Sequence, residues 1–239
     1  MTDEETLLNT LSDGTILTRH EETGFILIRR GDFLLSVFNE DNPLRLAKCY
    51  TAQLTDLCAV GISLGLSSSV LHFGGAGMTV ARALASWKRD VRQTVVDIDR
   101  ELVEAVIKVS PFPSAVDIIF GDARDHLDLA RTHSNIIIDV GTTCMDKGFT
   151  DLNLALLEGV LESADENRTI MFNVLNDPNS EHDTVTPVHA ALSAIGKPKA
   201  WKIVRDPEHP YTTVLAVSPN PQINDVWEGI EWSGWERTH

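Results

Sequence analysis

Residues 69–79 read SVLHFGGAGMT, a run of apolar residues that leads directly into a glycine-rich turn. Glycines at such a turn let backbone N–H groups approach a ligand closely, and the N-terminus of the following helix adds partial positive charge. Position 80 is valine, whereas the dinucleotide-binding motif GxGxxG needs glycine there for close packing of helix on strand. The stretch therefore predicts a strand, a ligand-binding loop and a helix, and it argues against a nicotinamide cofactor.

Strand and helix patterns alternate after residue 69, which is typical of a parallel sheet covered by helices. The expected strands are 70–73, 93–96, 116–120, 135–140, 169–174, 200–204 and 212–217. The expected helices lie at about 78–88, 100–108, 122–131, 150–163 and 184–195. Only residues 205–211 join the last two strands, which is too short for a helix, so these strands should pair antiparallel at the sheet edge. The pattern predicts an α/β, Rossmann-like class I methyltransferase fold with a seven-stranded mixed sheet.

The N-terminal part has a different pattern. Residues 15–38 form three β-rich stretches separated by turn residues, which predicts a small antiparallel β-meander. We expect this N-terminal β-domain to span residues 1–42. After Pro43 apolar residues recur at helical spacing, so residues 43–68 are expected to form a linker helix at the start of the second domain, residues 43–239.

Composition limits the possible partners and location. Thirty-five acidic and 20 basic residues give a formal charge of −15, which disfavours nucleic acid and anionic membranes. The N-terminus resembles no secretory signal and no apolar run reaches about 18 residues, so a cytoplasmic location is expected. The three cysteines form no CxxC pair, which argues against a disulfide framework and a metal site.

Carboxylates follow three of the expected strands. Asp97 lies twenty residues after Gly77, the distance at which an acidic side chain accepts hydrogen bonds from both ribose hydroxyls; the alternative is a helix cap. Asp99 fits better as the cap of the following helix. Asp122 could accept from the exocyclic amine of adenine or cap a helix, and Asp139 ends the fourth strand at the same edge.

A glycine loop and three carboxylates thus meet at the carboxyl ends of four strands, where open α/β sheets bind ligands. An acidic rim of this kind suits a nucleoside that carries a positive tail rather than a phosphate. S-adenosylmethionine and its decarboxylated form both fit this description.

The chain resembles the spermidine synthase family of aminopropyltransferases, particularly the shorter spermidine-synthase-like proteins of actinobacteria. The residues that carry the resemblance are VLHFGGAGMT (70–79), VDID (96–99), GDAR (121–124) and IIIDV (136–140), preceded by the linker 41–50. The resemblance implies dimers or tetramers formed through the N-terminal β-domain. It also implies that the donor is bound by Gly74, Gly75, Ala76, Gly77, Asp97, Ile98, Asp122, Ala123 and Asp139.

Three family contacts are missing from this chain. Family members read GGGDGG in the first loop, and Gly77 stands at the position of its aspartate. They read DSxDP after the fourth strand, where the second aspartate corresponds to Thr142. They also carry YHE on the helix beside the site, where this chain has Tyr50-Thr51-Ala52. Among the family's catalytic residues, the resemblance leaves Asp139 as the candidate base and Tyr50 to position the acceptor.

The resemblance implies transfer of an aminopropyl group from decarboxylated S-adenosylmethionine to a small polyamine acceptor. Two alternatives stay open. One is methyl transfer from S-adenosylmethionine to a small molecule, since a loop without the aspartate no longer repels the donor's carboxylate. The other is a nucleoside-binding protein that has lost catalysis. We expect a homodimer or homotetramer with a small amine substrate, without nucleic acid, membrane or metal partners.

Overall fold

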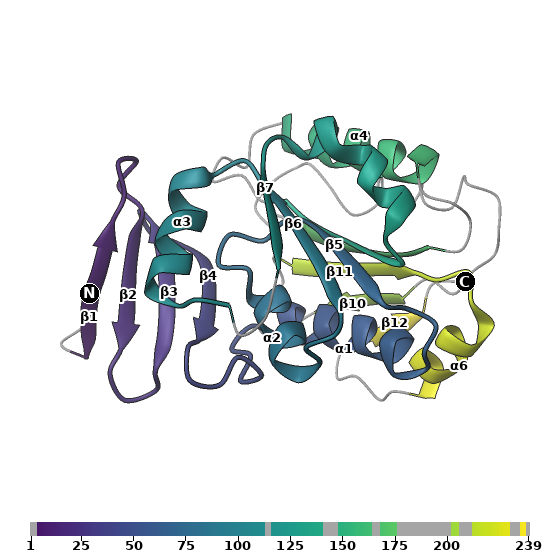
Figure 1. Ribbon diagram of the computed structural model, residues 1–239, viewed down its shortest axis with the longest axis horizontal. Helices are drawn as coiled ribbons and strands as arrows, with labels where there is room; N and C mark the ends of the chain where they lie inside the picture. Colours follow the sequence, from purple (N-terminus) through teal and green to yellow (C-terminus); the bar gives the residue numbers. More distant parts are fainter. Residues whose placement is uncertain are drawn as a thin grey trace.

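The computed structural model describes residues 4–112, 116–140, 148–163, 168–175, 202–205, 212–229 and 235–237. Two sheets make up the fold (Figure 1). The antiparallel N-terminal sheet consists of β1 (Glu5–Thr10), β2 (Ile16–His20), β3 (Phe25–Arg30) and β4 (Phe33–Asn39). The larger sheet consists of β5 (Ser69–Gly74), β6 (Arg92–Asp97), β7 (Asp117–Phe120), β8 (Asn135–Asp139), β9 (Thr169–Leu175), β10 (Lys202–Arg205), β11 (Thr212–Val217) and β12 (Trp235–Arg237).

The strand order of the larger sheet is β12-β10-β11-β9-β8-β5-β6-β7. Strands β5 to β9 pair in parallel, and β11 lies antiparallel between β9 and β10. This order confirms the predicted methyltransferase-type fold and the antiparallel pairing of the last two expected strands. The sheet has eight strands rather than seven, because the short β12 pairs with β10 and covers the edge that β10 would otherwise leave open. The expected helix 184–195 and the connection 206–211 lie outside the described residues.

Helices cover both faces of the larger sheet (Figure 1). They are α1 (Cys49–Ser63), α2 (Thr79–Trp87), α3 (Arg100–Val109), the 3₁₀ segment η1 (Ala123–Thr132), α4 (Gly148–Ser163) and α6 (Pro221–Gly229). Alternate residues along a strand point to opposite faces. Thus Leu71 and Phe73 of β5 pack with α4 and η1, whereas Val70 packs with α1, α2 and α6. Among the described helices, none is long and apolar enough to cross a bilayer.

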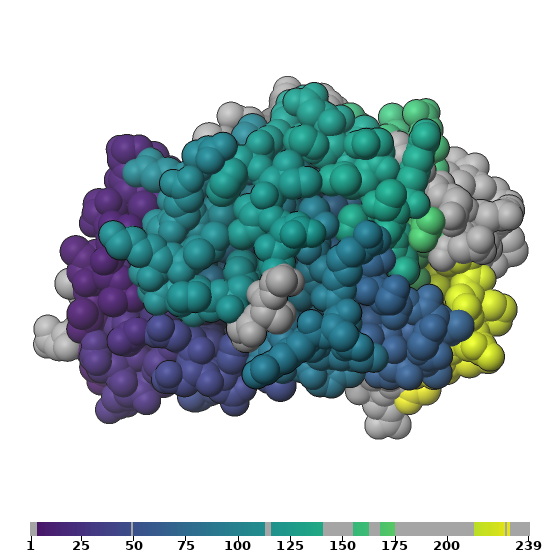
Figure 2. All heavy atoms as spheres, viewed as in Figure 1, coloured from purple at the N-terminus to yellow at the C-terminus, as the bar shows by residue number. Residues whose placement is uncertain are grey.

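The N-terminal sheet packs against α2 and α3 and shares a hydrophobic core with them. Ile26, Ile28 and Phe38 of the sheet belong to one buried cluster with residues of α2, α3 and β6. The space-filling view shows the purple N-terminal residues directly against the teal residues of the central part (Figure 2). The buried guanidinium of Arg82, on α2, lies between the Phe38 and Phe112 rings, 4.6 Å from each centroid, and ties the two parts together.

Three elements differ from the sequence expectations. The N-terminal sheet has an additional edge strand, β1, in which Glu5 pairs with Arg29 of β3, an interaction that apolar periodicity does not reveal. The linker helix begins at Cys49 rather than after Pro43, because the backbone N–H of Arg45 bonds the Asn42 carbonyl and closes a turn there. The segment expected as an α-helix at 122–131 is 3₁₀ and is kinked at His126.

Gly77 is the point where the glycine loop contacts the N-terminal sheet. A Cβ there would lie 2.6 Å from the Ser36 Oγ and 3.1 Å from the Ile28 Cδ1. We therefore expect Gly77→Ala to lower the free energy of unfolding by about 1–3 kcal/mol, as other overpacked core positions do. Denaturant titration measures this effect.

The matched control for this prediction is Gly229→Ala, because an added Cβ there has no atom within 4 Å, and its stability should change by less than about 0.5 kcal/mol. Adding Ser36→Gly to Gly77→Ala should restore part of the loss. Equal stability of Gly77→Ala and the unmodified protein would contradict this packing.

Candidate functional site

The parallel pairing of β5 with its two neighbours brings the predicted site residues to one edge of the sheet. Gly74 is the register partner of Asp139 on β8. Phe73 is the partner of Val96 on β6, so Asp97 follows at the next position. The loop after β5 therefore lies between two carboxylates, as the sequence predicted.

The glycine loop has a tightly constrained backbone. Gly74 has φ +78°, and a Cβ on it would lie 2.5 Å from the Asp139 carbonyl oxygen, so only glycine fits. Ala76 and Met78 have φ +45° and +55°, a conformation that side-chain-bearing residues rarely adopt. The Met78 N–H donates to the Gly75 carbonyl at 2.7 Å and closes the turn. Strained backbone of this kind is concentrated at ligand-binding sites.

Asp97 is the acidic residue most closely associated with this loop. Its carboxylate accepts a hydrogen bond from the Asp99 N–H at 2.9 Å and interacts with the backbone N–H of Ala76. Burial, which leaves Asp97 8% exposed, raises its pKa to about 6, and these backbone hydrogen bonds oppose the rise. A buried carboxylate beside a glycine loop is suited to accept hydrogen bonds from hydroxyl groups.

The two residues after Asp97 have separate roles. Ile98 is 72% exposed, an unusual position for an isoleucine, and it offers an apolar surface beside the carboxylate. Asp99 accepts from the Leu102 N–H at 3.0 Å and caps α3, as predicted. The Asp99 carboxylate also pairs with Arg30 of the N-terminal sheet at 2.9 Å.

Asp122 has the capping geometry that the sequence left as its alternative role. Its side chain accepts from the Arg124 N–H at 2.9 Å and caps η1, and it also pairs with the Arg124 guanidinium. These hydrogen bonds from Arg124 hold the pKa of Asp122 below its usual range. Ala123 follows, buried at the start of η1. Both Asp122 oxygens accept hydrogen bonds from Arg124, and a contact of Asp122 with an adenine amine stays a prediction.

Asp139 ends β8 beside a polar residue of the next strand. The Asn173 Nδ2 donates to the Asp139 Oδ1 at 2.7 Å. Burial raises the pKa of Asp139, while the Asn173 hydrogen bond and the positive charge of Lys48 oppose the rise. A carboxylate whose pKa is raised accepts a proton more readily than an ordinary one.

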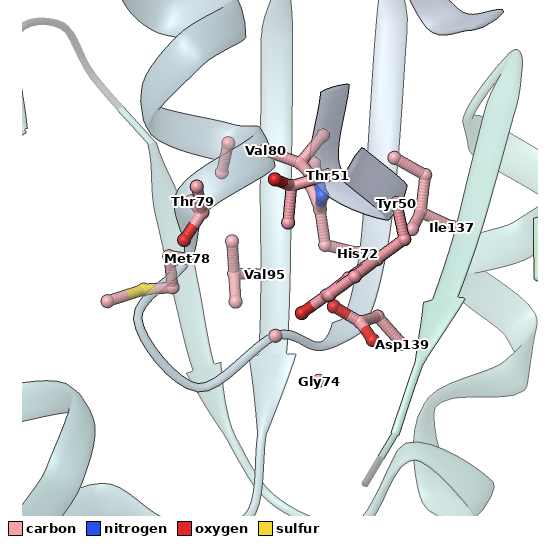
Figure 3. Close-up of a pocket in the computed structure, with 12 residues that line it drawn as sticks. Tyr50, Thr51, His72, Gly74, Met78, Thr79, Val80, Val95, Ile137 and Asp139 are labelled. Carbon is pink, nitrogen blue, oxygen red and sulfur yellow. The ribbon is translucent and has the colours of Figure 1, made fainter. Parts of the chain in front are cut away.

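Tyr50 reaches the same place from the first turn of α1. Tyr50 and Asp139 line the same cavity, and their polar ends point toward one another (Figure 3). Burial and the negative charge of Asp139 raise the pKa of Tyr50 well above its usual value, so its hydroxyl keeps its proton at neutral pH. The Lys48 Nζ lies 5.7 Å from the centroid of the Tyr50 ring, on the side of the N-terminal sheet.

A small cavity lies beneath the loop, between Tyr50, Asp139 and the buried residue His72 (Figure 3). Its volume is about 10 Å³, enough for roughly one water molecule. His72 bonds Gln93 at 2.9 Å, and burial lowers its pKa to about 4, so it is neutral at pH 7. A larger ligand would therefore lie over the loop, at the carboxyl edge, rather than inside this cavity.

Sequence reasoning missed three residues near this edge: Lys48, Asn173 and Ser36. Asn173 could have been found from the sequence, because it is an amide residue within the largely apolar strand TIMFNVL. Lys48 and Ser36 could not be found by pattern, because the packing of the N-terminal sheet brings them near the loop. Thr142 lies outside the described residues. No cluster of metal-binding side chains occurs in the part of the chain that the structure describes.

Comparison with known proteins gives similarity in structure only. No family model matches the chain, and no curated protein matches it in sequence. A probable spermidine synthase from Corynebacterium glutamicum is similar with a TM-score of 0.73 and 20% identity, over 92% of this chain and 81% of that one. A spermidine synthase in complex with the transition state analogue AdoDATO is similar with a TM-score of 0.63 and 12% identity, over 92% of this chain and 72% of that one. Human methyltransferase-like protein 13 in complex with SAH is similar with a TM-score of 0.55 and 14% identity, over 73% of this chain and 89% of that one.

These similarities confirm the methyltransferase-type fold and show that spermidine synthases share it. A match over 92% of the chain leaves about 19 residues unmatched, fewer than the 35 residues from Glu5 to Asn39. It therefore includes part of the N-terminal sheet. The narrower resemblance to an actinobacterial branch stays a prediction.

The raised pKa of Asp97 gives a test of this geometry by folding stability. An acid with a native pKa of about 6 and an unfolded value of about 3.9 makes the folded state less stable as pH rises between these values. Asp97→Asn removes this effect. The free energy of unfolding of the variant, minus that of the unmodified protein, should increase by about 2–3 kcal/mol from pH 4 to pH 7. Urea titrations at several pH values measure it, and a difference independent of pH would show that Asp97 is not desolvated.

Proposed function

We propose that the protein is a transferase that binds an adenosylated sulfonium compound and transfers one of its alkyl groups to a small amine. The observation that carries the proposal is the meeting of the strained glycine loop with Asp97 and Asp139 at adjacent strand ends. In this proposal Asp97 accepts from the ribose hydroxyls, Ile98 lies against the adenine, and the loop and Asp139 surround the sulfonium. The spermidine synthase and methyltransferases with similar folds support the same class of donor.

The first candidate reaction is aminopropyl transfer from decarboxylated S-adenosylmethionine to a polyamine. The lone pair of the acceptor amine forms a C–N bond, the C–S bond breaks, and its electron pair stays on sulfur, which leaves methylthioadenosine. The amine must first lose a proton, because its pKa of about 10 keeps it almost fully protonated at pH 7. Asp139 is the candidate acceptor of that proton, and its raised pKa favours this role. Tyr50, with its proton retained, positions the amine.

The second candidate is methyl transfer from S-adenosylmethionine, and the environment of Gly77 favours it. An aspartate at this position of the loop would bind the amine of a decarboxylated donor. Here even a Cβ would lie 2.6 Å from the Ser36 Oγ, so the structure has no room for that side chain. The loop therefore lacks the group that would select a decarboxylated donor.

Product analysis tests the proposal directly. The protein is incubated with each donor in the presence of putrescine, spermidine or no acceptor, and the products are identified by mass spectrometry. Methylthioadenosine formed only with a polyamine indicates aminopropyl transfer, and S-adenosylhomocysteine indicates methyl transfer. Formation of neither product, together with tight binding of methylthioadenosine, would favour a nucleoside-binding protein without catalysis.

Asp139→Asn tests the proposed base. The variant keeps an oxygen that can accept from Asn173, so the local structure should persist, but it cannot take up a proton. We expect kcat to fall about 10²–10⁴-fold, the usual contribution of a general base, while methylthioadenosine binds within about 3-fold of the unmodified affinity. The control is Asp128→Asn on the exposed side of η1. Unchanged turnover of Asp139→Asn would remove this role.

A further inference from the structure

We propose that Lys48 binds the α-carboxylate of the donor, and that the donor is therefore S-adenosylmethionine itself rather than its decarboxylated form. The inference rests on the proposed function, because it assumes that an adenosylated sulfonium compound lies at the carboxyl edge. It goes further by assigning a recognition residue and by choosing between the two donors.

The surroundings of Lys48 direct its charge toward the tail of such a donor. Its Nζ donates to the Leu34 carbonyl of β4 at 2.9 Å and lies over the Tyr50 ring. An ammonium has three N–H groups, and no carboxylate of the described residues lies within ion-pair distance of it. The charge of Lys48 acts on Asp139, and Tyr50 and Asp139 line the cavity under Gly74 and Gly75. The ammonium thus lies beside Tyr50, one of the residues that line this cavity, and it has N–H groups that the Leu34 carbonyl does not use.

A second positive charge, that of Arg82 on α2, lies near Gly77 of the loop. The Arg82 Nε donates to the Gly77 carbonyl at 3.2 Å, and the residue is 2% exposed. Burial lowers the pKa of Arg82 to about 10, so it stays charged at pH 7. The acid whose charge acts on Arg82, Glu40, is already paired with Arg19. A carboxylate at Gly77, which could balance these cations, is excluded by Ser36.

The two donors differ in the charges of their tails, and the positions of Lys48 and Asp139 distinguish between them. The tail of decarboxylated S-adenosylmethionine carries only an ammonium, which Asp139 can balance but which gives Lys48 no partner. The tail of S-adenosylmethionine carries an ammonium and a carboxylate, so Lys48 can pair with the carboxylate while Asp139 balances the ammonium. A hydrogen-bonded pair between two charged groups in a partly buried site contributes substantially to affinity.

Three ligands that differ stepwise in the tail test the inference by calorimetric titration. Methylthioadenosine has no charged tail, decarboxylated S-adenosylhomocysteine has the amine, and S-adenosylhomocysteine has both the amine and the carboxylate. We expect S-adenosylhomocysteine to bind the unmodified protein about 10-fold or more tightly than its decarboxylated form. In Lys48→Met this preference should disappear, while methylthioadenosine binds within about 2-fold of the original affinity. Lys48→Arg should retain the preference.

The control is Lys108→Met, since Lys108 is exposed in the last turn of α3, at the opposite edge of the sheet. Thermal unfolding shows whether Lys48→Met is folded. If it is not, the preference of Lys48→Arg for S-adenosylhomocysteine over its decarboxylated form still tests the inference. Equal affinity for the two homocysteine-type ligands, or an equal loss for all three in Lys48→Met, would overturn the role of Lys48 but leave the donor site intact. If methylthioadenosine does not bind the unmodified protein, the donor site itself is wrong, and this inference fails with it.

Discussion

Gly74 and Asp139 are partners on the two central parallel strands, and their backbones approach so closely that a Cβ on Gly74 would reach within 2.5 Å of the Asp139 carbonyl. This contact sets where the glycine loop leaves the sheet and how far it lies from the carboxylate of Asp139. The loop that follows has left-handed conformations at Ala76 and Met78 before α2 begins. The positions of the loop and of Asp139 therefore follow from this close approach of two parallel backbones, and the pairing of β5 with β6 places Asp97 on the other side.

The N-terminal sheet takes part in the site although it contributes no candidate catalytic group. Ser36 of β4 crowds any side chain at Gly77, and the Leu34 carbonyl of the same strand accepts a hydrogen bond from the ammonium of Lys48. Both contacts affect the end of the site where the tail of a donor would lie. A sheet that family resemblance associates with assembly thus also sets the position of Lys48 and the packing around Gly77.

Much of the fold could be predicted from sequence, because its elements depend on local pattern. The seven strands from β5 to β11 and the carboxyl-edge positions of Asp97 and Asp139 follow from apolar runs and from the geometry of parallel sheets. The edge strands β1 and β12 lack strong periodicity and form through pairing with a neighbour. Lys48 and Ser36 depend on contact between distant segments, and Asp122 depends on a competing partner, Arg124. The contacts of Lys48 and Ser36 are settled by tertiary packing, which a single sequence does not display, whereas the Asp122–Arg124 contact is a local choice between two roles that the sequence leaves open.

The core shared by Ile26, Ile28 and Phe38 with α2 and α3 bears on how this molecule folds. The N-terminal strands appear as a separate segment in the sequence, but they bury their apolar side chains against helices from the rest of the chain. Neither part alone would shield its share of that surface from water. Melting of the N-terminal strands and of the segment around the glycine loop should therefore belong to one cooperative unit, so that the loop gains its order together with a sheet that lies far from it in the sequence.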